Sequence, residues 1–322
     1  MVKIAIAAAS SQLARTIIDK LVETKKHEIV AFVRKSPDEF PPLSGVTWVQ
    51  TTYEDKAELV GLLQGVHTVL CFLAVHLDPR NANQKRLIDA SVEAGVKRFA
   101  PSEWSTGEKL DASIDSIPWY AGKVEVSDYL KELNRDKKVI EFCRFQPGSF
   151  LEYLGHPRVK SKYLYTIPGL VNFEKIHALA MEGTEDDPVA YTSVEDIANI
   201  VVRAVDYEGE WPVNGGIRGS VATLKELLRI GEKVRGKPFE LEWLKQSDVE
   251  AGIINTDNYL VVDLPSIPAD QVTAFSKMAT GKVLLSQHRG LWTPGDEWNR
   301  IFPDYKFVQI EDFLVKIFSD QA

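Results

Sequence analysis

Residues 2–35 read VKIAIAAASSQLARTIIDKLVETKKHEIVAFVRK, and this stretch decides the fold. It begins with a short apolar run that contains β-branched residues, which predicts a buried strand over 2–7. From Leu13 onward the apolar residues recur at helical spacing, and a second apolar run over 29–33 predicts another strand. The order of strand, tight turn, helix and strand is typical of the start of a parallel α/β sheet.

The turn between this first strand and first helix has the position of a phosphate-binding loop. Such a turn usually carries three glycines, and N–H groups at the helix N-terminus hold a pyrophosphate. Here Ala8, Ser11 and Ala14 stand at the three-residue-spaced positions. A side chain held in a left-handed conformation costs about 1–2 kcal/mol, which weakens a nucleotide site about ten- to thirtyfold without abolishing it. We expect the following residues to contact the cofactor, with the Ser11 hydroxyl on a phosphate oxygen: Ala8, Ser10, Ser11, Gln12 and Leu13. The alternative is an ordinary first turn that binds no nucleotide.

A basic pair, Arg34 and Lys35, ends the second strand. An acidic residue at this point binds the ribose 2′-hydroxyl of NAD, whereas an arginine accommodates the 2′-phosphate of NADP. The acidic residue of this strand, Glu28, stands at its start and cannot take that role. The pair therefore favours NADP(H) over NAD(H), and its alternative interpretation is a solvated basic pair at a strand end.

Composition narrows the class of protein. The chain has 322 residues, 44% of them hydrophobic, and a net charge of −8, which argues against nucleic acid or an anionic membrane as a partner. Cys71 and Cys143 both lie in apolar runs, as is typical of a reducing cytoplasmic compartment. No apolar stretch approaches the roughly 20 residues that span a bilayer. The histidines show no ligand spacing with cysteines or acids, so we expect no metal.

The first half of the chain alternates strands and helices, which predicts a doubly wound parallel sheet of the Rossmann-like α/β class. After the first helix and its two strands, we expect further strands over 47–50 and 68–74, one that ends at Ala100, and one over 139–145. We expect helices over 57–63, 81–94 and 119–133. Later helices are expected from the N-cap Ser193 to about 205, after a capping box at Thr223, and near 310–318. Residues 151–185 are expected to be irregular. We predict a dinucleotide-binding domain over 1–155 with returning segments about 186–222, and a smaller interwoven substrate-binding lobe over 156–185 and 223–322.

One stretch resembles a known family closely. It is Gln84, Leu87-Ile88-Asp89-Ala90 and Ala94-Gly95-Val96-Lys97-Arg98-Phe99-Ala100-Pro101-Ser102-Glu103-Trp104. This string is similar to a signature of the NmrA-like and isoflavone-reductase-like proteins, which are atypical short-chain dehydrogenases/reductases. Further matches are Val33-Arg34, Lys123 with Val126 and Tyr129-Leu130, Pro147-Gly148-Ser149-Phe150 with Tyr153-Leu154, and Ser193 to Ala198. The likeness is strong over 1–155, moderate to about 235 and thin beyond, and the glycines of the family's first turn are replaced here.

The resemblance implies roles for several residues. It implies that Arg34 holds the 2′-phosphate and that Lys123 stands beside the nicotinamide. It also implies that two strand ends flank the ribose and nicotinamide, through Phe72, Leu73, Ala74 and Ser102. NADP(H) is therefore the expected cofactor.

Lys123 and Tyr120 are the candidate catalytic residues. A lysine in a partly desolvated site has its pKa lowered toward neutrality, which makes it a usable proton donor or acceptor. The alternative is an exposed helix lysine paired with Glu125 or Asp128. Tyr120 is three residues before Lys123 and so lies on a neighbouring helix face, as a secondary acid or as a packing aromatic.

The substrate-binding candidates are a histidine and three aromatic residues: His76, Trp104, Phe150 and Tyr153. Together they suit a pocket for an aromatic or polycyclic substrate, although the aromatic residues would serve equally as core. The leading hypothesis is an NADPH-dependent reductase that transfers hydride to a carbonyl, imine or activated alkene of a small metabolite, as a monomer or homodimer. The alternatives are a non-catalytic dinucleotide-sensing regulator, and a redox-neutral isomerase, dehydratase or cyclase whose cofactor site has degenerated.

Overall fold

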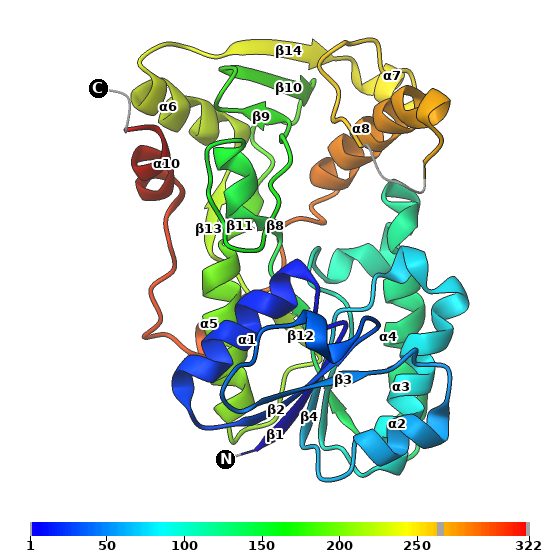
Figure 1. The fold of residues 1–322 in the computed structure, drawn as a ribbon. Coiled ribbons are helices and arrows are strands. Elements are labelled where there is room, and N and C mark those ends of the chain that lie inside the picture. Colours follow the sequence, from blue (N-terminus) through cyan, green and yellow to red (C-terminus); the bar gives the residue numbers. More distant parts are fainter. Residues whose placement is uncertain (1, 263–266, 320–322) are drawn as a thin grey trace.

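The computed structural model describes residues 2–262 and 267–319. A six-stranded, all-parallel sheet fills the lower half of Figure 1, in the order β3-β2-β1-β4-β5-β6. The chain winds outward in both directions from β1, which is the doubly wound arrangement expected from the sequence. The strands are β1 (Lys3–Ala7), β2 (Glu28–Val33), β3 (Val46–Gln50), β4 (Thr68–Cys71), β5 (Arg98–Ala100) and β6 (Glu141–Phe142).

Helices cover both faces of this sheet because the side chains of β1 alternate between two apolar cores. Ile4 and Ile6 pack with helices α1 and α5, whereas Ala5 and Ala7 pack with α2, α3 and α4 on the other face. A central parallel strand buried on both sides is therefore apolar at every one of these positions. The helices are α1 (Gln12–Thr24), α2 (Lys56–Leu62), α3 (Ala82–Glu93), α4 (Ala121–Leu133) and α5 (Val194–Asp206).

Two predicted strands are corrected. The run 139–145 is two strands: β6 pairs with β5, whereas β7 (Arg144–Gln146) pairs with β12 (Asn214–Gly216), and Cys143 lies between them. The pairing partner changes within one apolar run, which the apolar pattern of a single segment cannot show. The strand expected over 68–74 ends at Cys71, and the chain then turns into a short 3₁₀ helix, η2 (Val75–Leu77).

Two three-stranded sheets lie in the upper part of Figure 1, together with most of the helices that follow α5. One sheet holds β8 (Ser149–Phe150), β11 (Val189–Thr192) and β13 (Ser220–Ala222), and the other holds β9 (Val171–Asn172), β10 (His177–Met181) and β14 (Glu240–Leu244). The segment expected to be irregular therefore contains β9 and β10. The helices are α6 (Leu224–Arg235), α7 (Gln246–Glu250), α8 (Val272–His288), α9 (Glu297–Ile301) and α10 (Ile310–Phe318).

The predicted N-termini of helices α5 and α6 are confirmed. The Ser193 hydroxyl accepts the Asp196 N–H at 3.0 Å, and Thr223 forms a capping box with Glu226. Trp298 of α9 is fully buried in the core beside α1 and α5, so the last part of the chain returns to the large sheet. None of the helices in the two described ranges is both long and apolar enough to cross a bilayer.

Candidate active site

The three residues that replace glycines have three different backbone conformations. Ala8 follows β1 directly with φ +53°, in the left-handed region that favours glycine. Ser11 is the N-cap of α1 in an extended conformation, with φ −69° and ψ 156°. Ala14 lies inside α1 and is fully buried against the sheet. The strain expected for a side chain in this turn therefore applies at Ala8 alone.

The N-terminus of α1 offers donors to an anion. The N–H groups of Gln12, Leu13 and Ala14 have no hydrogen-bond partner among the described residues, and neither does the buried Ser11 hydroxyl. The first turn of α1 contains no acidic residue that would compete. By contrast, the N–H of Ala8 is held by the Tyr53 hydroxyl at 2.8 Å. The turn thus fits a diphosphate through the helix N-terminus and Ser11 rather than through Ala8.

Arg34 and Lys35 lie at the carboxyl end of β2, beside this turn. The Arg34 side chain is exposed and forms no ion pair with any described residue, whereas Lys35 pairs with Glu39 at 3.2 Å. The Arg34 charge reaches the Tyr53 hydroxyl, where it opposes the rise in pKa that burial causes. Arg34 is thus the cation of this pair whose charge remains free to bind an anion next to the turn.

The other expected cofactor contacts lie at the ends of β4 and β5. Phe72 and Leu73 are buried and Ala74 is half-buried, so the first two present mainly backbone to any ligand. The Phe72 ring stacks on Trp104 at 4.4 Å between centroids. The Ser102 N–H donates to the Gln84 side chain at 2.8 Å. These strand ends meet at one edge of the sheet because β4 and β5 pair in parallel.

Lys123 lies in the first turn of α4 and is buried. Its ammonium donates to the Ser105 hydroxyl at 2.6 Å and to the backbone carbonyl of Glu103. Burial lowers the pKa of Lys123 to about 8, against the opposing effect of the Glu103 carboxylate. The alternative of a surface pair with Glu125 does not fit, since Glu125 instead bonds to Lys85 and Asn81.

Tyr120 and Ser105 complete a chain of polar groups with Lys123. The Lys123 ammonium lies 3.9 Å from the centroid of the Tyr120 ring and donates to the Ser105 hydroxyl. Burial raises the pKa of Tyr120, and the neighbouring Ser105 side chain opposes that rise. Lysine, serine and tyrosine thus lie next to one another. Such a chain can pass a proton from the ammonium to the phenol oxygen.

The buried carboxyl of Glu103 stands behind this chain. Burial raises the pKa of Glu103, while the charges of Lys123 and Arg144 act to lower it. The Gln146 amide lies 3.4 Å from the carboxyl oxygen. Because Glu103 and Lys123 are both buried and of opposite charge, each favours the charged form of the other.

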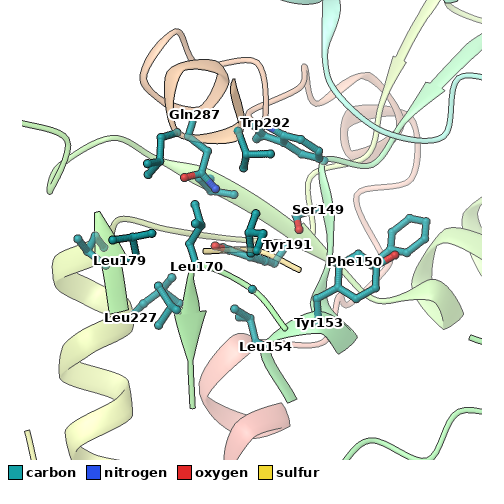
Figure 2. Close-up of a pocket in the computed structure, with 18 of the residues that line it drawn as sticks. Ser149, Phe150, Tyr153, Leu154, Leu170, Leu179, Tyr191, Leu227, Gln287 and Trp292 are labelled. Carbon is teal, nitrogen blue, oxygen red and sulfur yellow. The ribbon is translucent and has the colours of Figure 1, made fainter. Parts of the chain in front are cut away.

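A cavity of about 280 Å³ opens next to the chain of polar groups. Ser105 and Tyr120 line it, and Lys123 reaches it only through Ser105. The other walls come from the second half of the chain and are mostly apolar and aromatic, as Figure 2 shows. Three of the four substrate-binding candidates lie on its wall: Trp104, Phe150 and Tyr153.

His76 is a correction. It lies in η2, is exposed, and is not among the residues that line the cavity. The chain turns outward after β4, so a position one residue beyond the apolar run points into solvent. No group of three or more His, Cys, Asp or Glu side chains within 2–262 and 267–319 is placed to hold a metal ion.

Ser105, Tyr191 and Gln287 line the cavity without having been expected there. Ser105 directly follows Trp104, so the family string could have been extended by one residue to reach it. Tyr191 and Gln287 lie in β11 and α8, and nothing in their local sequence marks them as neighbours of Tyr120. Their placement depends on the packing of distant elements.

Comparisons with known proteins agree with this geometry. A model of the NmrA-like family matches residues 2–291. Quinone oxidoreductase 2 of Escherichia coli is 36% identical over 254 residues, which are 78% of this chain and 80% of that protein. An oxidoreductase of Botryotinia fuckeliana named BOA1 is 25% identical over 241 residues, which are 74% of this chain and 77% of that protein. A solved structure described as AtPrR2 with NADP+ and (+)pinoresinol has a TM-score of 0.71 at 18% identity, with 98% of each chain covered, and therefore shares the fold.

Proposed function

The chain belongs to the NmrA-like family and is an oxidoreductase, and on that premise we propose that it is an NADPH-dependent reductase of small neutral aromatic or polycyclic metabolites. The reducible group is a carbonyl, an imine or an activated alkene. One observation carries the proposal: Tyr120 lines an apolar cavity beside Ser105, whose hydroxyl accepts a hydrogen bond from a lysine with a pKa of about 8.

The cofactor would be held by residues at the first turn and the end of β2. The free N–H groups of Gln12 and Leu13 and the Ser11 hydroxyl would bind the diphosphate, and Arg34 the 2′-phosphate. When bound there, NADPH supplies a hydride from its nicotinamide ring. The NADP+ in the AtPrR2 structure supports this choice of cofactor.

The residues of this chain would manage the proton. Reduction of a carbonyl needs one proton at the oxygen, and Tyr120, which lines the cavity, would donate it. Ser105 then donates its own proton to the phenol oxygen and takes one from the Lys123 ammonium. Lys123 can release that proton near neutral pH because burial has lowered its pKa.

The cavity supports an aromatic substrate. Its walls include the rings of Trp104, Phe150 and Tyr153, and none of the described residues that line it is a lysine, arginine or histidine. An apolar wall with a few polar groups is what binds and orients a small neutral molecule. The name of the Escherichia coli relative, a quinone oxidoreductase, agrees with a flat conjugated substrate.

The test has two steps. First, titration of the full chain with NADPH and NADH is expected to show micromolar NADPH binding and weaker NADH binding. Second, loss of NADPH absorbance is followed with menadione and with an aromatic ketone as probes, in the wild type and in Lys123→Met. The exposed α4 residue Lys131 provides the matched control, Lys131→Met.

The outcomes separate the candidate functions. Turnover that Lys123→Met abolishes and Lys131→Met preserves supports the reductase. Saturable NADPH binding without turnover of any probe would indicate the dinucleotide-sensing regulator. No saturation at millimolar NADPH would contradict the proposal and leave the redox-neutral enzyme, which the left-handed conformation of Ala8 favours.

A further inference from the structure

Two polar side chains face the apolar cavity without partners. Tyr191 in β11 is 7% exposed, and its hydroxyl forms no hydrogen bond with any described residue. Gln287 in α8 also lines the cavity, and its amide is likewise without a partner in the described part of the chain. Figure 2 shows both side chains pointing into the cavity from different elements, next to Leu170. A ligand that displaced water from these groups without replacing its hydrogen bonds would leave them unsatisfied, which is unfavourable by about 1–3 kcal/mol, so the site favours a ligand with a matching polar group.

The surroundings of these two groups are apolar. Leu179 of β10 and Leu227 of α6 are almost fully buried beside them and cannot supply a hydrogen bond. Burial raises the pKa of Tyr191, and no charged neighbour contributes, so the hydroxyl stays neutral. The pair therefore forms a small polar spot within an apolar wall.

Several other polar groups of the cavity wall are already engaged, whereas the hydroxyls of Ser149 and Tyr153, like that of Tyr191, have no hydrogen-bond partner among the described residues. Asp187, the charged residue among those lining the cavity, bonds to His288 at 2.8 Å. The Thr184 hydroxyl donates to the Met181 carbonyl at 2.7 Å, and the Trp292 ring N–H donates to Ser286 at 2.8 Å. Tyr191 and Gln287 thus both have unused hydrogen-bonding capacity on the side of the cavity formed by β11 and α8.

We propose that Tyr191 and Gln287 form a specificity subsite for a neutral oxygen substituent, a hydroxyl or a carbonyl, on the ring system of the substrate. A phenol hydroxyl and a primary amide each donate and accept, so together they satisfy both the hydrogen and the lone pairs of such a group. An anionic substituent is disfavoured because the described residues that line the cavity include the acidic Asp187 and no cation. This inference rests on the proposed function, since it names the substrate class of the same cavity.

The subsite is distinct from the groups that would carry the reaction. Tyr191 and Gln287 come from β11 and α8, whereas Ser105, Tyr120 and Lys123 come from the loop after β5 and from the start of α4. A substrate would therefore be held by its oxygen substituent at one place and reduced at another. This arrangement fixes which ring carbon faces the reductant.

The experiment compares three bicyclic probes that differ in one group: naphthalene, naphthol and naphthoate. Binding to the full chain is measured by calorimetry, with and without saturating NADP+, so the readout does not need turnover. In the wild type, naphthol is expected to bind about tenfold or more tightly than naphthalene, and naphthoate more weakly than naphthol. Tyr191→Phe and Gln287→Leu should each remove most of the preference for naphthol and leave naphthalene binding within about twofold.

The matched control is Tyr165→Phe, which removes the same oxygen from a side chain that is 81% exposed and does not line the cavity. It should leave all three affinities unchanged. Thermal unfolding of each variant establishes that the fold is intact, and the two cavity variants test the subsite independently of each other.

An unchanged preference for naphthol in both cavity variants overturns the subsite, and so does tighter binding of naphthoate than of naphthol. These results differ from failure of the proposed function. If the variants lose the preference for naphthol while neither menadione nor the aromatic ketone is reduced, the subsite stands and the reductase does not. If NADPH is oxidised normally but the preference is absent from the wild type, the reductase stands and the subsite does not.

Discussion

The Tyr53 hydroxyl accepts a 2.8 Å hydrogen bond from the backbone N–H of Ala8. The same hydroxyl lies 3.3 Å from the Phe32 carbonyl, to which it donates, and Tyr53 has no exposed surface. A side chain that follows β3 therefore holds the turn after β1 in its left-handed conformation. This bond explains how an alanine keeps a backbone angle that normally requires glycine.

Tyr53→Phe should destabilise the protein by about 1–3 kcal/mol, because it leaves the N–H of Ala8 without its partner. Chemical unfolding measures the free energy of unfolding directly. Tyr165→Phe, at an exposed position, is the control and should have no effect. Equal stability of Tyr53→Phe and the wild type would show that water replaces the bond.

Ala8→Gly and Ala14→Gly should have opposite effects. Glycine at Ala8 removes the left-handed strain of about 1–2 kcal/mol, part of which is offset by the greater freedom of glycine in the unfolded chain. Position 14 lies inside α1, and glycine there should cost about 1 kcal/mol, since it raises the conformational entropy of the unfolded chain and removes a buried methyl. Thermal unfolding of the two variants shows whether each change in stability has the expected sign. A gain in stability at both positions would contradict the assigned conformations.

Arg34→Ala should weaken NADPH binding about tenfold or more and change NADH binding little, because only NADPH carries the 2′-phosphate. Lys35→Ala is the matched control. Its ammonium pairs with Glu39, so its effect on NADPH should be smaller. Titration by fluorescence or calorimetry gives both affinities. Equal losses for NADPH and NADH would remove the role of Arg34 in cofactor choice.

Ser105→Ala should lower kcat about a hundredfold or more and leave KM for NADPH unchanged, since it interrupts the path from Lys123 to Tyr120. In the wild type, kcat should fall as pH rises through about 8, because Lys123 must be protonated to supply the proton. Ser105→Ala should lose this dependence. Stopped assays across the pH range measure kcat for both proteins. If Ser105→Ala keeps the pH dependence of kcat seen in the wild type, the path through Ser105 is excluded.

Glu152 should make stability depend on pH. It lies in the short 3₁₀ helix Leu151–Gly155, and its buried carboxyl accepts the N–H of Val194 at the start of α5 at 3.0 Å. Burial raises its pKa from 4.5 to about 7. The folded state therefore holds a proton that the unfolded state has lost between these values, so stability should fall as pH rises from 4.5 to 7. Glu152→Gln should flatten this part of the curve, and the exposed Glu195→Gln should not. Unfolding at several pH values measures the slopes, and equal slopes for Glu152→Gln and the wild type would contradict the assignment.

Much of the large sheet could be predicted because each of its elements is defined by neighbouring residues. Alternation between apolar strands and amphipathic helices gave the parallel sheet and helices on both faces, and caps such as Ser193 and Thr223 are local hydrogen bonds. The run 139–145 could not be divided in this way, because its two halves pair with strands that are far apart in the sequence. Pairing partners are a property of the folded chain.

The candidate site likewise contains residues that the local sequence indicated and residues that only packing brought together. Arg34 and Lys123 could be proposed from their positions after a strand and on a helix, and Trp104, Phe150 and Tyr153 from their aromatic side chains. By itself, then, the sequence determined the order of strands and helices in most of the large sheet, the basic strand end and the family, because these depend on local periodicity and on short strings of residues. Only the tertiary structure decided that Tyr53 supports Ala8, that Ser105 joins Lys123 to Tyr120, that His76 faces solvent, and that Tyr191 and Gln287 share one cavity. The physical reason is that burial and hydrogen bonding between distant segments arise from packing, which no local pattern of residues records.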